Sequence, residues 1–259
     1  RYGLWRHDES SDRIFGWPIL DDYFWPVLGV KKELGGPETT NIYELGLLEE
    51  VTGRTLRPGG FVLTEQALEL CRFTEGATIL DIGCGSGATV QLLREKYNLN
   101  ALGIDISEKM IKTGKCISPD LPLMQADASN LPFSANEFDG VFLECSFSLF
   151  SDRRKVLTEI HRVLKTEGKI VISDFYYQNR PGKTKEDMLG LLDETGFAVE
   201  YWQKKSDYLA QLLADCILSG KPAELLWNCL LAKEDNKCFG KEEIKKWKPD
   251  YFLLIGKKV

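Results

Sequence analysis

Short apolar runs alternate with helix-like segments along most of this 259-residue chain, and this alternation constrains its fold more than any other feature. The apolar runs have the length of strands, and the segments between them repeat apolar residues at helical spacing. The runs cover residues 77–83, 100–107, 123–127, 138–145, 169–176, 197–202 and 251–257. Strands that alternate with helices form right-handed β-α-β units. The sequence therefore predicts an α/β fold with a doubly wound, mostly parallel sheet.

Start and stop signals place the helices between these runs. Ser107 follows the second run and is positioned to cap a helix. Residues 152–165 carry apolar residues on one helical face, and Gly168 is expected to end that helix. Thr184 is expected to cap a later helix, which Gly196 stops. These signals support the alternation of strands and helices.

Two segments depart from the pattern. Residues 1–57 hold three of the six Trp at irregular spacing, interrupted by prolines, which indicates an extension that either wraps the core or covers a pocket. Residues 203–250 precede the last strand and contain amphipathic runs that begin at Ser206 and Pro222. We interpret them as a helical insertion. Its leucine-rich face is a candidate roof for a pocket or a candidate homodimer surface.

Overall composition excludes several classes of function. The chain has a formal net charge of −6, so it offers no electrostatic attraction to nucleic acid, and we expect no such partner. It shows no run of 18 apolar residues and no signal peptide, so we expect no membrane span. The seven cysteines form no C-x-x-C pair and only two histidines are present. This pattern predicts reduced thiols in a cytoplasmic protein and no metal site.

Chemistry is concentrated in residues 81–87 (DIGCGSG), where the first strand passes into a helix. Glycines there allow the backbone to approach a ligand closely. Gly83-x-Gly85-x-x-Ala88 fits the dinucleotide fingerprint, with Asp105 as the ribose-binding acid, which suggests an NAD(P)-dependent oxidoreductase. However, Asp81 immediately precedes the glycines. A carboxylate at this place favours a ligand with a positive ammonium group and repels a pyrophosphate.

Five motifs in order, ILDIGCGSG, GIDIS, QADASNLPF, FDGVFLEC and EIHRVLKTEGKIVISDF, resemble those of class I S-adenosylmethionine-dependent methyltransferases. The chain is most similar to the small-molecule group that includes the ubiquinone/menaquinone C-methyltransferases and the type 11 proteins. The resemblance covers roughly residues 76–202 and 251–257. It implies a seven-stranded sheet whose last strand is antiparallel. It also implies a methyltransferase domain over residues 58–259, preceded by the extension 1–57 and interrupted by the insertion 203–250.

The resemblance further implies which residues bind S-adenosylmethionine and its product S-adenosylhomocysteine. Asp81 would face the amino group, and Asp105 would accept both ribose hydroxyls, a task suited to a carboxylate. Ile106 and Met110 would pack on the adenine, with Asp127 at its amino group. The full set is Asp81, Gly83, Cys84, Gly85, Gly87, Asp105, Ile106, Met110, Asp127, Ala128 and Glu144. Residues 59–64, with Tyr43 as a lesser candidate, are expected to cover this cofactor.

Methyl transfer from a sulfonium is an in-line displacement that needs mainly alignment and exclusion of water. A general base is needed only for some acceptors, and the candidates at the carboxyl edge of the sheet are Glu144, Asp174, Tyr176 and Tyr177. Motifs used for nucleic-acid bases, such as Pro-Pro-aromatic after the fourth strand, are absent. We therefore expect a small apolar or aromatic acceptor. Two alternatives remain, an NAD(P)-dependent oxidoreductase and a non-catalytic cofactor-binding partner protein.

Overall fold

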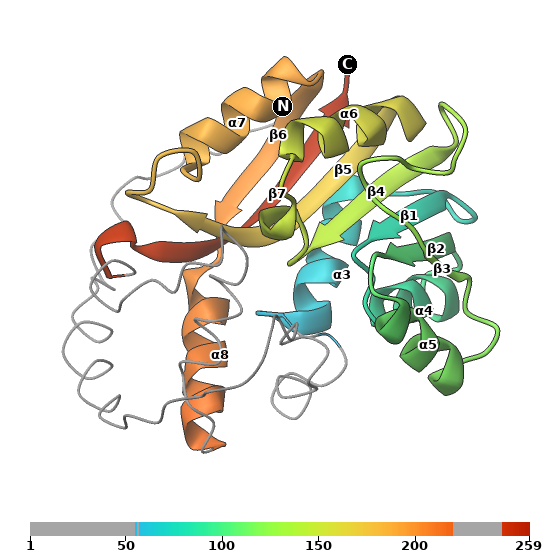
Figure 1. Cartoon of the computed structure of the whole chain (residues 1–259), viewed down its shortest axis with the longest axis horizontal. Coiled ribbons are helices and arrows are strands. Elements are labelled where there is room, and N and C mark those ends of the chain that lie inside the picture. The colour runs from blue at the N-terminus through green and yellow to red at the C-terminus, as the bar shows by residue number, and fades with distance from the viewer. Residues whose placement is uncertain (1–54, 56, 220–244) are drawn as a thin grey trace, which may run out of the picture.

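The computed structural model describes residues 55, 57–219 and 245–259, and these form one seven-stranded sheet covered by helices (Figure 1). The strands are β1 Thr78–Ile82, β2 Asn100–Asp105, β3 Leu123–Gln125, β4 Phe138–Glu144, β5 Leu164–Tyr177, β6 Phe197–Lys204 and β7 Pro249–Lys258. The helices are α3 Gly60–Cys71, α4 Ala88–Glu95, α5 Glu108–Ile117, the 3-10 helix η5 Phe147–Leu149, α6 Arg153–Val163, α7 Lys185–Glu194 and α8 Ser206–Leu218. Every apolar run that the sequence marked as a strand forms one.

The order of the strands is β3-β2-β1-β4-β5-β7-β6. β1 pairs in parallel with β2 on one side and with β4 on the other. β7 runs antiparallel to both β5 and β6. The predicted seven-stranded, mostly parallel sheet with an antiparallel last strand is therefore confirmed. The direction in which successive strands are added reverses between β1 and β4, and such a reversal opens a crevice at the carboxyl ends of the strands.

Helices cover both faces of the sheet, as a doubly wound fold requires. Helices α3, α4, α5 and α8 supply apolar side chains to the core on one face. Helices α6 and α7 supply the core on the other face. Successive side chains of β4 point to opposite faces of the sheet. Phe142 packs in the first core, and Val141 and Leu143 pack in the second. All three are fully buried, which explains why this strand reads as a continuous apolar run.

Both predicted helix caps are present. The Ser107 hydroxyl accepts a hydrogen bond from the Met110 N–H at the start of α5. Thr184 and Asp187 form a reciprocal capping box at the start of α7. In contrast, α6 ends at Val163, before the expected stop. The chain passes directly into β5 at Leu164, which is fully buried and pairs with Phe138 of β4.

Residues 59–64, which the sequence analysis expects to cover the cofactor, lie at the start of α3. Gly59 and Gly60 both have positive φ and begin α3, so the segment is the first turn of a helix. Thr64 is fully buried within it. Tyr43, the rest of the extension before Thr55, and residues 220–244 of the insertion lie outside the described residues. Within the described part, the amphipathic run that begins at Ser206 forms α8 as expected. No helix in this part of the chain is long and apolar enough to cross a membrane.

Candidate functional site

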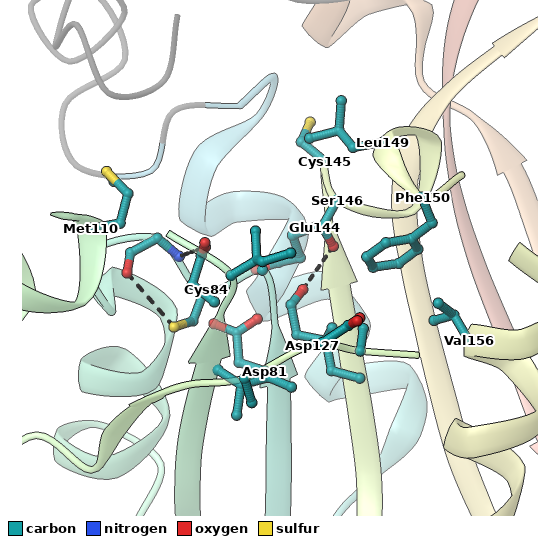
Figure 2. Close-up of a pocket in the computed structure, with 18 of the residues that line it drawn as sticks. Asp81, Cys84, Met110, Asp127, Glu144, Cys145, Ser146, Leu149, Phe150 and Val156 are labelled. Carbon is teal, nitrogen blue, oxygen red and sulfur yellow. Dashed lines mark hydrogen bonds between the residues drawn. The ribbon is translucent and has the colours of Figure 1, made fainter. Parts of the chain in front are cut away.

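A cavity of about 660 Å³ lies at the carboxyl ends of β1, β2 and β4, where the strand order reverses. Its size suits a small organic ligand. Figure 2 shows Met110 at one end, Phe150 and Val156 at the other, and Asp81 between them. Every residue that the sequence assigned to the cofactor lines this cavity except Gly87. Gly87 instead stands at the N-cap of α4 with φ of 82° and lies against Leu121 and Leu123.

Hydrogen bonds to other residues of the chain fix the conformation of the glycine turn after β1. The N–H groups of Gly83 and Cys84 donate to the Ile104 carbonyl at 2.8 and 3.0 Å. The Gly85 N–H donates to an Asp105 carboxylate oxygen at 2.9 Å. The Gly87 N–H donates to the Cys84 carbonyl at 2.9 Å. All four N–H groups are thus already used inside the protein.

Only glycine fits at position 83. Its φ is 77°, and an added Cβ would stand 2.4 Å from the Ser146 Cβ. Ser146 follows Cys145, a non-glycine residue with φ of 55°, and its hydroxyl donates to the Ile82 carbonyl at 2.7 Å. The chain after β4 therefore packs directly on the turn after β1.

We expect Gly83→Ala to destabilise the protein by about 2 kcal/mol or more, since backbone strain and a steric clash both contribute. Gly182 is a matched control, because its φ is 78° but no atom lies within 4 Å of an added Cβ. Gly182→Ala should cost about 1 kcal/mol, from backbone strain alone. Urea unfolding measures both, and adding Ser146→Gly to Gly83→Ala should recover part of the loss. Equal costs for the two alanine variants would contradict the Ser146 contact.

Asp105 ends β2 and borders the turn. One carboxylate oxygen accepts from the Gly85 N–H and the other from the Ser107 N–H at 2.8 Å. An ionised carboxylate has about four acceptor sites, so one that is held by the backbone is suited to bind hydroxyl groups as well. The two bonds also fix its orientation toward the cavity that it lines.

Asp81, the acid before the glycines, is 3% exposed and lines the same cavity. No described residue donates a hydrogen bond to its carboxylate, which points into the cavity in Figure 2. Burial, followed by the charge of Glu144, raises the pKa of Asp81 well above its usual value of 3.8. A buried acid without partners is stabilised in its charged form by a cationic ligand.

Glu144 at the end of β4 takes part in a buried charge network. Its carboxylate lies 2.8 Å from the Arg57 guanidinium, and the two side chains are 5% (Arg57) and 3% (Glu144) exposed. The hydroxyls of Thr64 and Thr89 each donate to one Glu144 oxygen at 2.8 Å. The same hydroxyl oxygens accept from Arg57 at 2.7 and 3.0 Å. We call these four side chains the Arg57 network. It ties the start of α3 and the first turn of α4 to the end of β4.

The residues assigned to the adenine come from the segments that follow β2 and β3. Ile106 is 72% exposed and Met110 comes from the first turn of α5. The Asp127 carboxylate accepts from the N–H and the hydroxyl of Ser129 at 2.8 and 2.9 Å. These two bonds hold the pKa of Asp127 below its usual value. Asp127 is thus an oriented, ionised acceptor beside Ala128.

An apolar wall completes the cavity, formed by Leu149 and Phe150 after β4 and by Val156 of α6 (Figure 2). Asp174 anchors the backbone of this wall, because its carboxylate accepts a hydrogen bond from the Ser148 N–H at 2.8 Å. Asp174 is completely buried, and burial raises its pKa. It therefore orients the wall and does not itself reach the cavity.

The four candidate general bases do not gather at one place. Glu144 lines the cavity, but the Arg57 network uses both of its oxygens. Asp174, Tyr176 and Tyr177 do not line it in the described part of the chain. β5 continues to Tyr177 and pairs with β7 along that whole stretch, so these side chains are packed in the sheet. Burial also raises the pKa of Tyr176 strongly, and Asp250 adds to the effect.

Sequence reasoning did not identify several residues of this site: Arg57, Thr89 and Ser146, and Leu149, Phe150 and Val156 of the apolar wall. Arg57 ends the extension 1–57, but its partner is Glu144, which no spacing rule connects to it. The partial signal was a charged residue directly before Pro-Gly-Gly, next to a helix that packs on the sheet.

Comparisons with known proteins identify relatives of this chain. Residues 80–172 match the family model described as a methyltransferase domain. The demethylmenaquinone methyltransferase of Thermotoga maritima is 35% identical over 116 residues, which cover 44% of this chain and 51% of that protein. The chain therefore spans about half the length of this relative.

Two solved structures are similar in fold. The 4+2 cyclase SpnF superposes with a TM-score of 0.67 at 21% identity, covering 84% of this chain and 93% of the other. A phosphoethanolamine N-methyltransferase 2 of Haemonchus contortus, solved with phosphomonomethylethanolamine and S-adenosylhomocysteine, gives a TM-score of 0.64 at 19% identity. It covers 84% of this chain and 56% of the other. At these identities the likeness establishes the fold.

Proposed function

We propose that this chain, whose residues 80–172 belong to a class I S-adenosylmethionine-dependent methyltransferase domain, transfers the methyl group of S-adenosylmethionine to a small apolar or aromatic acceptor. The bound donor supplies a methyl group on a positively charged sulfur, already activated for displacement. The residues of the chain bind and orient the reactants and exclude water.

The observation that carries this proposal is the closed hydrogen bonding of the glycine turn. In a dinucleotide site the turn N–H groups and the helix N-terminus bind the pyrophosphate. Here the N–H groups of Gly83, Cys84 and Gly85 all donate within the protein. The turn is also flanked by the carboxylates of Asp81 and Asp105. This environment disfavours a pyrophosphate and suits a ligand with an ammonium group and a ribose, so it speaks against the NAD(P) alternative.

The proposed residue roles follow from these placements. Asp105, which lines the cavity, binds the ribose hydroxyls through its carboxylate. Asp81 binds the amino group of the donor. The positive charge of that group stabilises the ionised form of the Asp81 carboxyl, which burial disfavours. Ile106 and Met110 pack on the adenine, and Asp127 accepts from its amino group.

The apolar wall supports an apolar or aromatic acceptor. Leu149, Phe150 and Val156 line the end of the cavity opposite Met110 (Figure 2). Because Arg57, Thr64 and Thr89 all bind the Glu144 carboxylate, we propose that the acceptor reaches its nucleophilic form without a base from this residue. A phenol or carbon acid that has already lost its proton to water in neutral solution meets this condition.

Cellular context is part of the proposal. The five cysteines in the described residues are all free thiols, which supports a reducing, cytoplasmic location. The acidic net charge supports a small-molecule partner in place of nucleic acid.

Leu218 at the end of α8 is 85% exposed, which supports a homodimer contact through the insertion. Light scattering at several protein concentrations tests the dimer.

Titration calorimetry of the purified chain tests the proposed donor. We expect micromolar binding of S-adenosylmethionine and S-adenosylhomocysteine and no binding of NADH. The reverse pattern would overturn the proposal in favour of an oxidoreductase. Transfer of a labelled methyl group to a panel of phenols and activated carbon acids then tests activity. Tight donor binding without transfer to any acceptor would support the non-catalytic alternative.

A further inference from the structure

The Arg57 network is an unusual way to hold a helix against a sheet. A buried ion pair is costly to desolvate, and apolar residues of the same volume often stabilise a fold as well or better. Here the pair is almost completely buried, yet both members line the ligand cavity. Its position in the cavity wall therefore suggests a role toward the ligand.

Both charges of the pair affect the pKa of Asp81, which lines the same cavity. After burial, the charge of Glu144 is the largest influence that raises the pKa of Asp81, and the charge of Arg57 lowers it. Asp81 is the residue to which we assign the ammonium group of the donor. A charge on Glu144 without Arg57 would therefore act on a ligand held beside Asp81.

We propose that Arg57 is a positioning residue that acts through Glu144: it cancels the negative charge of that carboxylate in the wall of the donor site. This inference rests on the proposed function. S-adenosylmethionine and S-adenosylhomocysteine differ by one methyl group and one positive charge on sulfur. A wall with an uncompensated carboxylate would favour the sulfonium, whereas the neutral pair treats the two forms more evenly.

Similar affinity for the charged and the uncharged sulfur matters for catalysis, because the positive charge on sulfur disappears as the methyl group leaves. Stabilisation that the donor enjoys only before transfer deepens the bound ground state and raises the barrier. The Arg57 network lets Glu144 anchor Thr64 and Thr89 without this penalty.

The test is the ratio of the two dissociation constants, S-adenosylhomocysteine over S-adenosylmethionine, measured by titration calorimetry. Arg57→Met leaves Glu144 uncompensated and should raise the ratio about tenfold, the order expected for one unit charge in a partly buried site. Glu144→Gln keeps the size and hydrogen-bonding capacity of the side chain and leaves Arg57 uncompensated. It should lower the ratio by a similar factor. The double variant should return the ratio to within about twofold of the parent, since neither charge remains.

Arg94→Met is the matched control, because Arg94 donates to the Ala101 carbonyl outside the cavity. It should leave the ratio unchanged. A purely structural role of the network would change both dissociation constants in the same direction and leave the ratio constant, which would overturn the inference. If Arg57→Met does not fold, the ratio measured for Glu144→Gln tests the inference: a lower ratio than in the parent supports it, and an unchanged or higher ratio overturns it. Failure of the parent protein to bind either compound would instead overturn the proposed function.

Discussion

Asp105→Ala is expected to weaken the binding of S-adenosylhomocysteine by roughly a hundredfold or more. Two hydrogen bonds from ribose hydroxyls to a charged acceptor are lost, and each is worth about 1.5–3 kcal/mol. The same change removes the acceptor of the Gly85 and Ser107 N–H groups, so the turn loses its anchor as well. Titration calorimetry measures the affinity.

Two comparisons separate ligand contact from damage to the turn. Asp105→Asn keeps one oxygen acceptor and should give an intermediate loss of affinity. Asp120→Ala removes an exposed carboxylate outside the cavity and should have no effect. An affinity of Asp105→Ala within threefold of the parent would disprove the assignment of the ribose to this residue.

Asp81→Asn is expected to change stability and donor affinity in opposite directions. Because the pKa of Asp81 is raised in the folded protein, its contribution to stability is fully present below the usual value of 3.8 and is lost as the pH rises through the folded-state pKa. Asparagine has no charge to bury, so the ligand-free variant should be more stable than the parent at neutral pH. It should also bind S-adenosylhomocysteine more weakly, since the ammonium group loses its counter-charge.

Thermal unfolding and calorimetry measure the two effects of Asp81→Asn. A change of 1 kcal/mol moves the Tm of a chain of this size by about 2–4 °C, so the gain is measurable. The difference in Tm between variant and parent should shrink as the pH is lowered through the raised folded-state pKa, where the parent carboxyl becomes protonated. A variant that is less stable than the parent at neutral pH, or that binds the ligand equally well, would contradict the role of Asp81.

The parts of the fold that could be predicted from the sequence are those whose signal is local. β1, β2 and β4 are buried on both faces, so each reads as an apolar run, and the glycine turn follows β1 directly. Asp105 could be placed because carboxyl ends of parallel strands share one edge of the sheet. Ser107 and Thr184 could be identified as caps because capping involves neighbours within three residues.

The parts that could not be predicted depend on contacts between distant residues. Thr64 and Glu144 are 80 positions apart, and nothing in the spacing of either predicts their contact. Asp174 lies near the carboxyl edge, as expected, yet its side chain turns to the Ser148 N–H and away from the cavity. The direction of a side chain at a strand end depends on the loop that packs over it, and this loop follows a different strand.

The bond from Ser146 to the Ile82 carbonyl has a consequence for how the proposed donor and acceptor sites can vary independently. This bond joins the carboxyl ends of β1 and β4, which border the proposed donor site. Leu149 and Phe150 lie beyond that joint, and both are partly exposed. If the proposed function holds, substitution of these two side chains should change acceptor specificity and leave donor affinity unchanged, which makes them the positions to vary when substrate scope is engineered.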